Sequence, residues 1–224
     1  MHTINGIIQN NHIEYENIKE HIGKTIQIHG SIYKIRRMSG FAFVILRTSR
    51  ELIQCIYSHE FSEFNLDILK EESCIELTAF VVADERSRTG WELRMISVKV
   101  LTTPSSESPI VINNKRVDTS LENLLNYRPI TLRNEKERAI FKLQEGICKG
   151  FRNFLLDNKF TEIHSPKLVY AGAEGGANIF TVNYFGKELY LAQSPQFYKQ
   201  MMVGVFERVF EIGPVFRAEK HDTS

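Results

Sequence analysis

Apolar and polar residues alternate through much of the first half of the chain. Five segments rich in Ile, Val, Phe and Tyr predict strands, and several of them show the period of two that a half-buried strand requires. These segments are residues 25–35, 41–47, 52–58, 74–82 and 91–101. Between the third and the fourth segment, apolar residues recur at helical spacing, so we expect a helix within residues 59–73. The residues at that spacing are Phe61, Phe64, Ile68 and Leu69.

Five strands with one helix after the third are the layout of an OB-fold barrel. This fold often presents one face to single-stranded nucleic acid. We therefore expect an N-terminal five-stranded OB-fold barrel within residues 1–102.

The pattern changes after Leu101. Residues 103–130 are rich in Ser, Asn and Pro and show little periodicity, which favours a hinge or linker. Asn134 is then a good N-cap for a long helix, with acidic residues in its first turn. Gly146 and Gly150 are four residues apart on this helix and would let another backbone come close, either within one subunit or across a subunit interface.

The next part of the chain predicts short strands around a glycine-rich loop. Residues 160–170 read as a strand that Pro166 interrupts, and residues 171–178 as the loop. Residues 181–186 and 188–192 read as two further strands.

A second helix is predicted to start at Ser194, a good N-cap, followed by Pro195 at the first helical position. Gln196 and Lys199 are three residues apart and share one helix face. The pattern alone is compatible with a binding face or with an ordinary solvated surface.

Arg217 and Glu219 are two residues apart in a segment that we expect to be a strand, so their side chains should point the same way. A guanidinium can bind a phosphate through two hydrogen bonds, and a carboxylate beside it can accept hydrogen bonds from an amine. A structural ion pair is the alternative interpretation of these two residues.

Composition narrows the possible functions. The net charge is +1, which argues against a protein that binds polyanions through bulk electrostatics. The sequence contains no long apolar run and does not begin with a secretory signal, so we expect a cytoplasmic protein without a membrane segment. The three cysteines are widely spaced in apolar surroundings and are expected to be reduced core thiols.

Three motifs resemble those of the class II aminoacyl-tRNA synthetases. FTEIHSPKLV at residues 160–169 resembles motif 1, and FERVFEIGPVFRAE at residues 206–219 resembles motif 2 with its Phe-Arg-x-Glu core. Between these motifs, QSPQFYKQ at residues 193–200 resembles a segment of the aspartyl-tRNA synthetases of the archaeal-like type, which belong to subclass b. The resemblance implies an anticodon-binding barrel at residues 1–102, a hinge at 103–130, and the start of a class II antiparallel-sheet catalytic domain at 131–224.

The resemblance also implies a reaction and its cofactors. ATP and Mg²⁺ would activate aspartate to aspartyl-adenylate, and the aspartyl group would then pass to tRNA(Asp) or also to tRNA(Asn). Arg217 would be the catalytic residue that holds the α-phosphate of ATP, and Glu219 would bind the adenine amino group. Aspartate would be bound by the following residues: Glu174, Ser194, Gln196 and Lys199.

In the barrel, the resemblance implies anticodon contacts from Arg36, Phe43, Gln54 and Glu92. Phe43 would be a stacking platform for a base, although its alternation with Phe41 and Ile45 is equally compatible with the core of the barrel. The motif 1 region implies a homodimer, and the resemblance places no metal ligand within these residues.

The sequence departs from the family pattern after Glu219. The rest of the motif 2 loop, the acidic Mg²⁺ ligands and motif 3 are not found in the five residues that follow. We therefore expect a fragment of a longer synthetase or a natural truncation, inactive on its own in forming aspartyl-adenylate. Three alternatives stay open: an asparaginyl-type sister enzyme, a non-catalytic tRNA-binding paralogue, and a plain single-strand binder.

Overall fold

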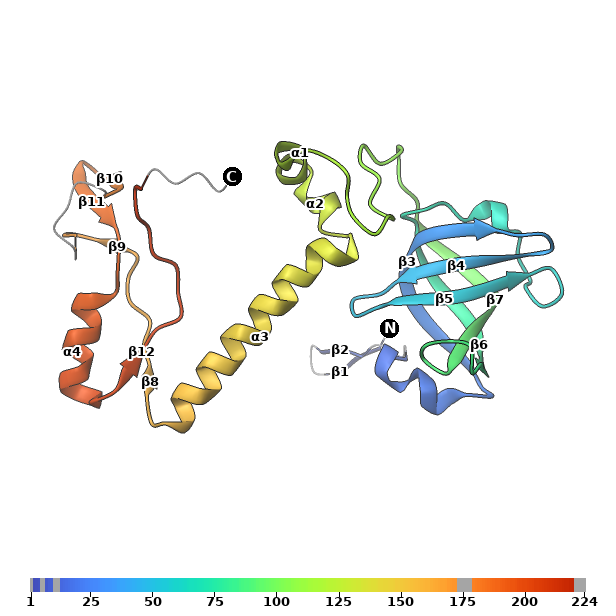
Figure 1. Cartoon of the computed structure of the whole chain (residues 1–224), viewed down its shortest axis with the longest axis horizontal. Coiled ribbons are helices and arrows are strands. Elements are labelled where there is room, and N and C mark those ends of the chain that lie inside the picture. Colours follow the sequence, from blue (N-terminus) through green and yellow to red (C-terminus); the bar gives the residue numbers. More distant parts are fainter. Residues whose placement is uncertain (1, 5–6, 10–12, 173–178, 220–224) are drawn as a thin grey trace. The chain divides into compact units, whose positions relative to one another are not determined.

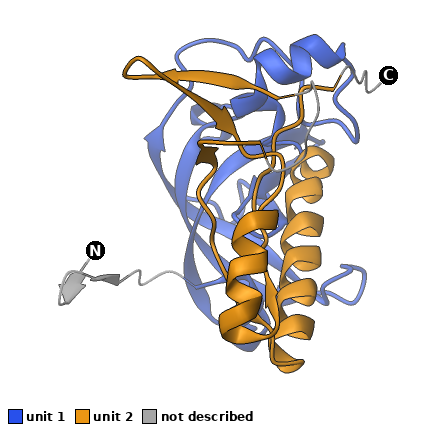
Figure 2. Cartoon of the chain, turned by 90° about the vertical axis from the view of Figure 1, so that its left-hand side faces the viewer, with its two compact units in different colours: residues 1–134 blue, residues 135–224 orange. Residues whose placement is uncertain are grey.

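The computed structural model describes residues 2–4, 7–9, 13–172 and 179–219. The chain forms two compact units, Met1–Asn134 and Glu135–Ser224, which Figure 2 colours separately.

Five strands of the first unit close into a barrel in the order β3-β4-β5-β7-β6 (Figure 1). They are β3 (Thr25–Arg37), β4 (Phe41–Arg47), β5 (Leu52–Ser58), β6 (Cys74–Ala83) and β7 (Trp91–Thr102). All five predicted strands and the predicted barrel are therefore confirmed. Neighbouring strands are antiparallel except β5 and β7, which are parallel.

The barrel closes because β3 pairs with two strands in turn. Its first part pairs with β6 and its second part with β4, and the change of partner occurs at Ser31. Gly30 lies directly before this point, where an added Cβ would be 2.6 Å from Leu46 Cγ. Only glycine lets Leu46 pack against the bend without displacement.

The inward-facing residues of the strands form the core, which explains the period of two in the sequence. On β4 the buried residues are Ala42, Val44 and Leu46, each at most 1% exposed. Phe43 therefore faces outward and does not belong to the barrel core.

The helix expected within residues 59–73 is reduced to one short 3-10 turn, η2 (Leu66–Ile68). The extended backbone of Asn65 starts this turn, and its side chain accepts a hydrogen bond from Asp67 N. Phe64 and Leu69 pack against the barrel core, whereas Phe61 lies against Arg94 and Ile68 is exposed. The helical spacing was thus coincidental, because no common surface faces all of these residues.

The first unit also contains a short hairpin and three short helices. The hairpin pairs β1 (His2–Ile4) with β2 (Ile7–Gln9), and the 3-10 helix η1 (Tyr15–His21) follows. Residues 103–130, expected as a linker, contain α1 (Leu121–Asn126) and most of α2 (Arg128–Thr131). Ser120 caps α1 by accepting a hydrogen bond from Asn123 N at 3.2 Å. Ile110, Ile112 and Val117 form a second small core.

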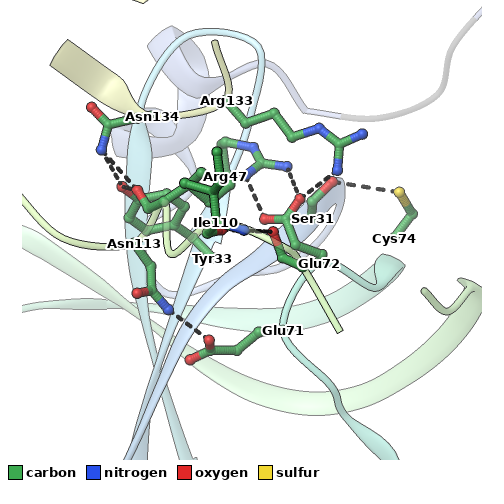
Figure 3. Close-up of polar contacts among 12 residues, drawn as sticks. Ser31, Tyr33, Arg47, Glu71, Glu72, Cys74, Ile110, Asn113, Arg133 and Asn134 are labelled. Atoms are coloured by element: carbon green, nitrogen blue, oxygen red, sulfur yellow. Dashed lines mark hydrogen bonds and ion pairs between the residues drawn. The ribbon is translucent and has the colours of Figure 1, made fainter. Parts of the chain in front are cut away.

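Buried polar side chains fix this segment to the barrel (Figure 3). The Tyr33 hydroxyl donates to the carbonyl oxygen of Ile112 at 2.7 Å. The side-chain amide of Asn134, which is 1% exposed, donates to the carbonyl oxygens of Ile112 and Asn114 at 2.7 and 2.8 Å. These backbone carbonyl oxygens lie outside any sheet, and side chains therefore supply the hydrogen bonds that buried backbone groups need.

A carboxylate shared by two arginines makes the second connection. Glu72 accepts two hydrogen bonds from Arg47, at 2.7 and 3.0 Å, and one from Arg133 at 2.7 Å. The side chains of Arg47 and Glu72 are 11% and 13% exposed. Burial would raise the pKa of Glu72, but the hydrogen bonds from both arginines outweigh it and hold the pKa below its ordinary value of 4.5.

The second unit begins with the long helix α3 (Glu135–Asp157), directly after Asn134 as expected. Two small sheets follow: β10 (Thr181–Tyr184), β11 (Lys187–Leu191) and β9 (Leu168–Val169) form one, and β12 (Val209–Phe210) pairs parallel with β8 (Thr161–Glu162) in the other. Pro166 separates β8 from β9, as predicted. The helix α4 (Gln196–Phe206) lies between β11 and β12 in the chain.

The strand expected around Arg217 and Glu219 is not formed, because residues 211–219 adopt no regular structure. A strand needs a repeated ladder, whereas the described backbone bond from this segment is a single one, from Phe216 N to the carbonyl oxygen of Ala192 at 2.9 Å.

All three cysteines are free, in accordance with the expectation of reduced thiols. Cys55 alone is fully buried in the core, where burial raises the pKa of its thiol, while Cys74 and Cys148 are partly exposed. Among the described helices, none has the length and apolar character that a membrane crossing needs.

We expect Glu72→Gln to destabilise the first unit by about 3 kcal/mol, because it leaves the guanidinium of Arg47 buried without its anion. Urea denaturation followed by the fluorescence of Trp91, the single tryptophan, would measure the effect. The matched control is Asp67→Asn, because Asp67 pairs with Arg37 at a surface where their side chains are 70% and 58% exposed, so that a loss below about 1 kcal/mol is expected.

The stability advantage of the wild type, that is, its larger free energy of unfolding relative to Glu72→Gln, should also depend on pH. Since the folded-state pKa of Glu72 is lowered, the advantage is present above the ordinary value of 4.5 and is lost as the pH falls through the folded-state pKa. An advantage that stays constant well below pH 4.5 would contradict this assignment.

Candidate functional site

The four barrel residues that the sequence selected lie on the outer surface of the barrel. Arg36 on β3 is paired with Phe43 on β4, and Gln54 on β5 is paired with Ile45 on β4. Paired residues share a face of the sheet, and alternate residues of a strand do so as well. We call this surface, defined by Arg36, Phe43, Gln54 and Glu92, the outer barrel face.

Glu92 joins the outer barrel face from β7. Its inward neighbour Leu93 is paired with Cys55 in the core, so Glu92 points outward. Gln54 Nε2 donates to Glu92 Oε1 at 3.1 Å. Although it faces outward, Glu92 is only 9% exposed. Burial, with a contribution from the carboxylate of Asp84, raises the pKa of Glu92 despite the hydrogen bond from Gln54.

Phe43 supplies an aromatic surface at the centre of this face. Its ring is partly exposed and contacts Phe41 edge to face, with ring centroids 5.2 Å apart. Arg36 opposite is exposed. A ring, a guanidinium, an amide and a carboxyl on one surface can stack on a base and bind its edge.

A surface hollow of about 470 Å³ adjoins Glu92. It is lined by residues 82–86, which lead into the connection between β6 and β7, and by Ile56, Glu92 and Arg94. Asp84 accepts hydrogen bonds from the backbone and side chain of Arg86, whose own side chain is 90% exposed. Arg94 lies over the ring of Phe61, 5.6 Å from its centroid.

Sequence reasoning did not select Asp84, Arg86 or Arg94. The available signal was the charged stretch between the last two strands, because the loops at the ends of an OB-fold barrel border its binding face.

In the second unit, α4 presents Gln196 and Lys199 as predicted. The Ser194 hydroxyl accepts a hydrogen bond from Gln196 N at 3.2 Å. The helix begins one residue later than predicted, with Pro195 as the N-cap and Gln196 as the first helical residue. Lys199 is partly buried, and within the described part of the chain its ammonium group has no ion-pair or hydrogen-bond partner.

Lys199 is not among the described residues that line the hollow beside Ser194. Ser194 lines a hollow of about 200 Å³ together with Phe197, Tyr198 and Met201. At 100° per residue, those α4 side chains leave the helix on the side away from Gln196 and Lys199. Glu174, which the sequence also selected for amino-acid binding, lies outside the described residues.

Arg217 and Glu219 lie near each other although they are not on a strand. Arg217 Nη1 and Glu219 Oε1 are 3.9 Å apart, and their side chains are 48% and 39% exposed. The bond from Phe216 to Ala192 places this segment beside the residues that lead into α4. In the described ranges there is no group of three or more His, Cys, Asp and Glu side chains that could hold a metal ion.

Comparisons with known proteins agree with this geometry. Residues 120–224 match the family model of the tRNA synthetases class II (D, K and N). The chain is 41% identical over 207 residues to an aspartate–tRNA(Asp/Asn) ligase of Deinococcus radiodurans, covering 92% of this chain and 46% of the relative. It is 40% identical over 207 residues to the ligase of the same name from Thermus thermophilus, with 92% and 48% coverage.

Two solved structures are similar to this chain in fold. The asparaginyl-tRNA synthetase of Pyrococcus horikoshii complexed with asparaginyl-adenylate matches with a TM-score of 0.85 and 31% identity, over 95% of this chain and 49% of that one. The aspartyl-tRNA synthetase of Entamoeba histolytica matches with a TM-score of 0.69 and 28% identity, over 95% and 47%.

The chain spans about half the length of the relatives it matches. The barrel, the positions of the three motifs and these similarities agree with one another. Residues 120–224 are therefore a domain of the class II tRNA synthetases (D, K and N), and the relatives that the chain matches are ligases.

Proposed function

We propose that the protein is an aspartate–tRNA ligase, which activates aspartate with ATP and transfers it to tRNA(Asp). The observation that carries this proposal is Lys199, a partly buried cation without a partner in the described structure, one turn into a helix that begins beside the Arg217 segment. A cation in this position favours an anionic ligand group such as the side-chain carboxylate of aspartate. The names of the relatives with 41% and 40% identity support the same substrate.

In the first step, a carboxylate oxygen of aspartate bonds to the α-phosphorus of ATP, and the bond from that phosphorus to pyrophosphate breaks. Arg217 would hold the α-phosphate as negative charge develops on it, while Glu219 accepts hydrogen bonds from the adenine amino group. Lys199 and Gln196 would fix the amino acid. The chain's contribution is therefore positioning and charge neutralisation, without a covalent intermediate on the protein.

Mg²⁺ would arrive bound to the phosphates of ATP, as is usual for this cation. The described residues do not group three metal ligands, so we assign no residue and no step to the metal.

The outer barrel face would bind the anticodon of the tRNA. Phe43 would stack on one base, Arg36 would contact the backbone or a base edge, and Gln54 and Glu92 would bind base edges. The names of the relatives include both tRNA(Asp) and tRNA(Asn), and we propose tRNA(Asp) as the minimum.

The open surface of α3 supports a homodimer. An added Cβ at Gly146 or Gly150 would meet nothing within 4 Å, and apolar side chains along the helix are exposed, among them Ile140, Ile147 and Phe154 at 63%, 62% and 66%. Such a face would be covered by a second copy. We place the protein in the cytoplasm, where tRNA is charged.

Asparagine is the second candidate substrate. The asparaginyl enzyme of Pyrococcus horikoshii has a higher TM-score than the aspartyl enzyme of Entamoeba histolytica, 0.85 against 0.69. An asparagine side chain carries no charge, however, and would leave the ammonium group of Lys199 without an anion.

Amino-acid-dependent exchange of pyrophosphate into ATP, measured on the protein expressed from its complete gene, tests the substrate. We expect exchange with aspartate and not with asparagine, and a loss of about 100-fold in kcat/KM for Lys199→Met, equivalent to one strong charge-assisted hydrogen bond. Lys187→Met, which changes an exposed lysine of the second unit, is the control and should leave exchange unchanged. Exchange with asparagine alone would contradict the proposal.

Binding of tRNA(Asp) to the 224-residue chain, measured by fluorescence anisotropy, tests the outer barrel face. We expect Phe43→Leu to weaken binding by about 1–3 kcal/mol, because leucine keeps apolar volume beside Phe41 but cannot stack on a base. Phe185→Leu is the control, since Phe185 is 91% exposed in the turn between β10 and β11. Equal affinities of the two variants for tRNA(Asp) would show that Phe43 does not belong to the interface.

Glu92→Gln should weaken tRNA binding and yet stabilise the first unit. Since the folded-state pKa of Glu92 is raised, its ionised form disfavours folding at neutral pH, and this penalty disappears as the pH falls through the folded-state pKa toward the ordinary value of 4.5. A higher urea midpoint at neutral pH, converging with the wild type in acid, is the expected result. Glu60→Gln, at an exposed glutamate, should change neither property; a lower midpoint for Glu92→Gln at neutral pH would refute the assignment.

A further inference from the structure

A side chain replaces the backbone ladder where β8 and β12 end. The parallel pairing continues as far as the bond from Ile163 N to the carbonyl oxygen of Phe210, at 2.9 Å. In a parallel ladder the N–H groups of alternate residues face the same neighbour, so the next N–H on this edge belongs to Ser165. Glu211, the residue after β12, instead accepts hydrogen bonds from Ser165 N at 3.2 Å and from the Ser165 hydroxyl at 2.7 Å.

Lys167 adds a charge to this connection. Its ammonium group donates to Glu211 and, at 3.1 Å, to the Ser165 hydroxyl. The side chain of Glu211 is 3% exposed and that of Lys167 is 25% exposed. Burial would raise the pKa of Glu211, but the hydrogen bonds from Lys167 and Ser165 outweigh it and lower the pKa, so the carboxylate stays ionised.

The same lysine is also connected to the other end of the Arg217 segment. The carbonyl oxygen of Lys167 accepts a hydrogen bond from Ala192 N, and the carbonyl oxygen of Ala192 accepts one from Phe216 N, each at 2.9 Å. Residues 211–216 are therefore connected to Lys167 at both ends: Glu211 binds its ammonium group, and Phe216 is linked through Ala192 to its carbonyl oxygen. We call this closed set of contacts the circuit. Arg217 is the next residue after this circuit.

Gly213 lets the chain pass close over the ion pair. An added Cβ there would be 3.2 Å from Glu211 Oε1 and 3.4 Å from Lys167 Nζ. A side chain at this position would press on the carboxylate of Glu211, so glycine eases the close approach of the backbone to the ion pair.

We propose that Glu211 is a positioning residue, which holds Arg217 at the reacting phosphate through its contacts with Lys167 and Ser165. The role in catalysis rests on the proposed function, whereas the mechanical part, the fixing of residues 211–216, does not. The two parts are therefore tested separately.

The mechanical part is tested by hydrogen exchange on the 224-residue chain. Glu211→Gln keeps the size of the side chain but removes its charge, and we expect the amide of Phe216 to exchange about tenfold faster or more, as local opening becomes easier. Lys167→Met should do the same, and Lys167→Arg should keep exchange slow. The control is Glu207→Gln, because Glu207 is an exposed carboxylate between α4 and β12. Unchanged exchange in Glu211→Gln would overturn the proposal.

The catalytic part is tested by pyrophosphate exchange with the protein expressed from its complete gene. Glu211→Gln should lower kcat about tenfold or more while the KM for aspartate changes little, because a displaced Arg217 acts on the phosphate and not on the amino-acid site. Loss of kcat that merely follows the folded fraction, measured by circular dichroism, would count against positioning. If Glu211→Gln does not fold, Ser165→Ala keeps the ion pair and should show the same pattern with a smaller loss. A wild type without aspartate-dependent exchange would refute the proposed function but leave the hydrogen-exchange result to decide on the circuit.

Discussion

Closure of the barrel through β3 decides which strand residues of the first unit point outward and can form the outer barrel face. Because β3 pairs with β6 and then with β4, all five strands must place one set of alternate residues inside. The other set is forced outward, and Phe43, Gln54 and Glu92 belong to it. The outer barrel face is thus a direct consequence of filling the core, and it depends on the absence of a side chain at Gly30.

Outside the barrel, hydrogen bonds from single polar side chains fix the backbone, as the hydrogen-bonded ladders between strands do within the barrel. Asn134 and Tyr33 bind the carbonyl oxygen of Ile112, Glu72 joins two arginines, and Glu211 binds the N–H of Ser165 where the ladder between β8 and β12 ends. These groups are buried or largely buried, so each hydrogen bond is costly to lose and fixes one geometry. The segments that composition describes as irregular are therefore held at a few identifiable points.

The sequence predicted those parts of the fold that local patterns determine. The strands were found because each buries alternate residues, and α3 and α4 because Asn134 and Ser194 precede them. The helix within residues 59–73 was wrong because only some of its apolar residues face the barrel core, and the strand at Arg217 was wrong because pairing depends on distant backbone. For the same reason the spacing of residues could not show that Glu211 meets Lys167.

The parallel pairing of β8 with β12 implies an order of events on the ribosome. All barrel strands are available once Thr102 has emerged, and most of their pairings join neighbours in the sequence. By contrast, β8 must wait for β12, which is made after α4 is complete. The first unit can therefore fold while the second is still being synthesised, and the apolar residues around β8 stay exposed to chaperones until Val209 and Phe210 arrive.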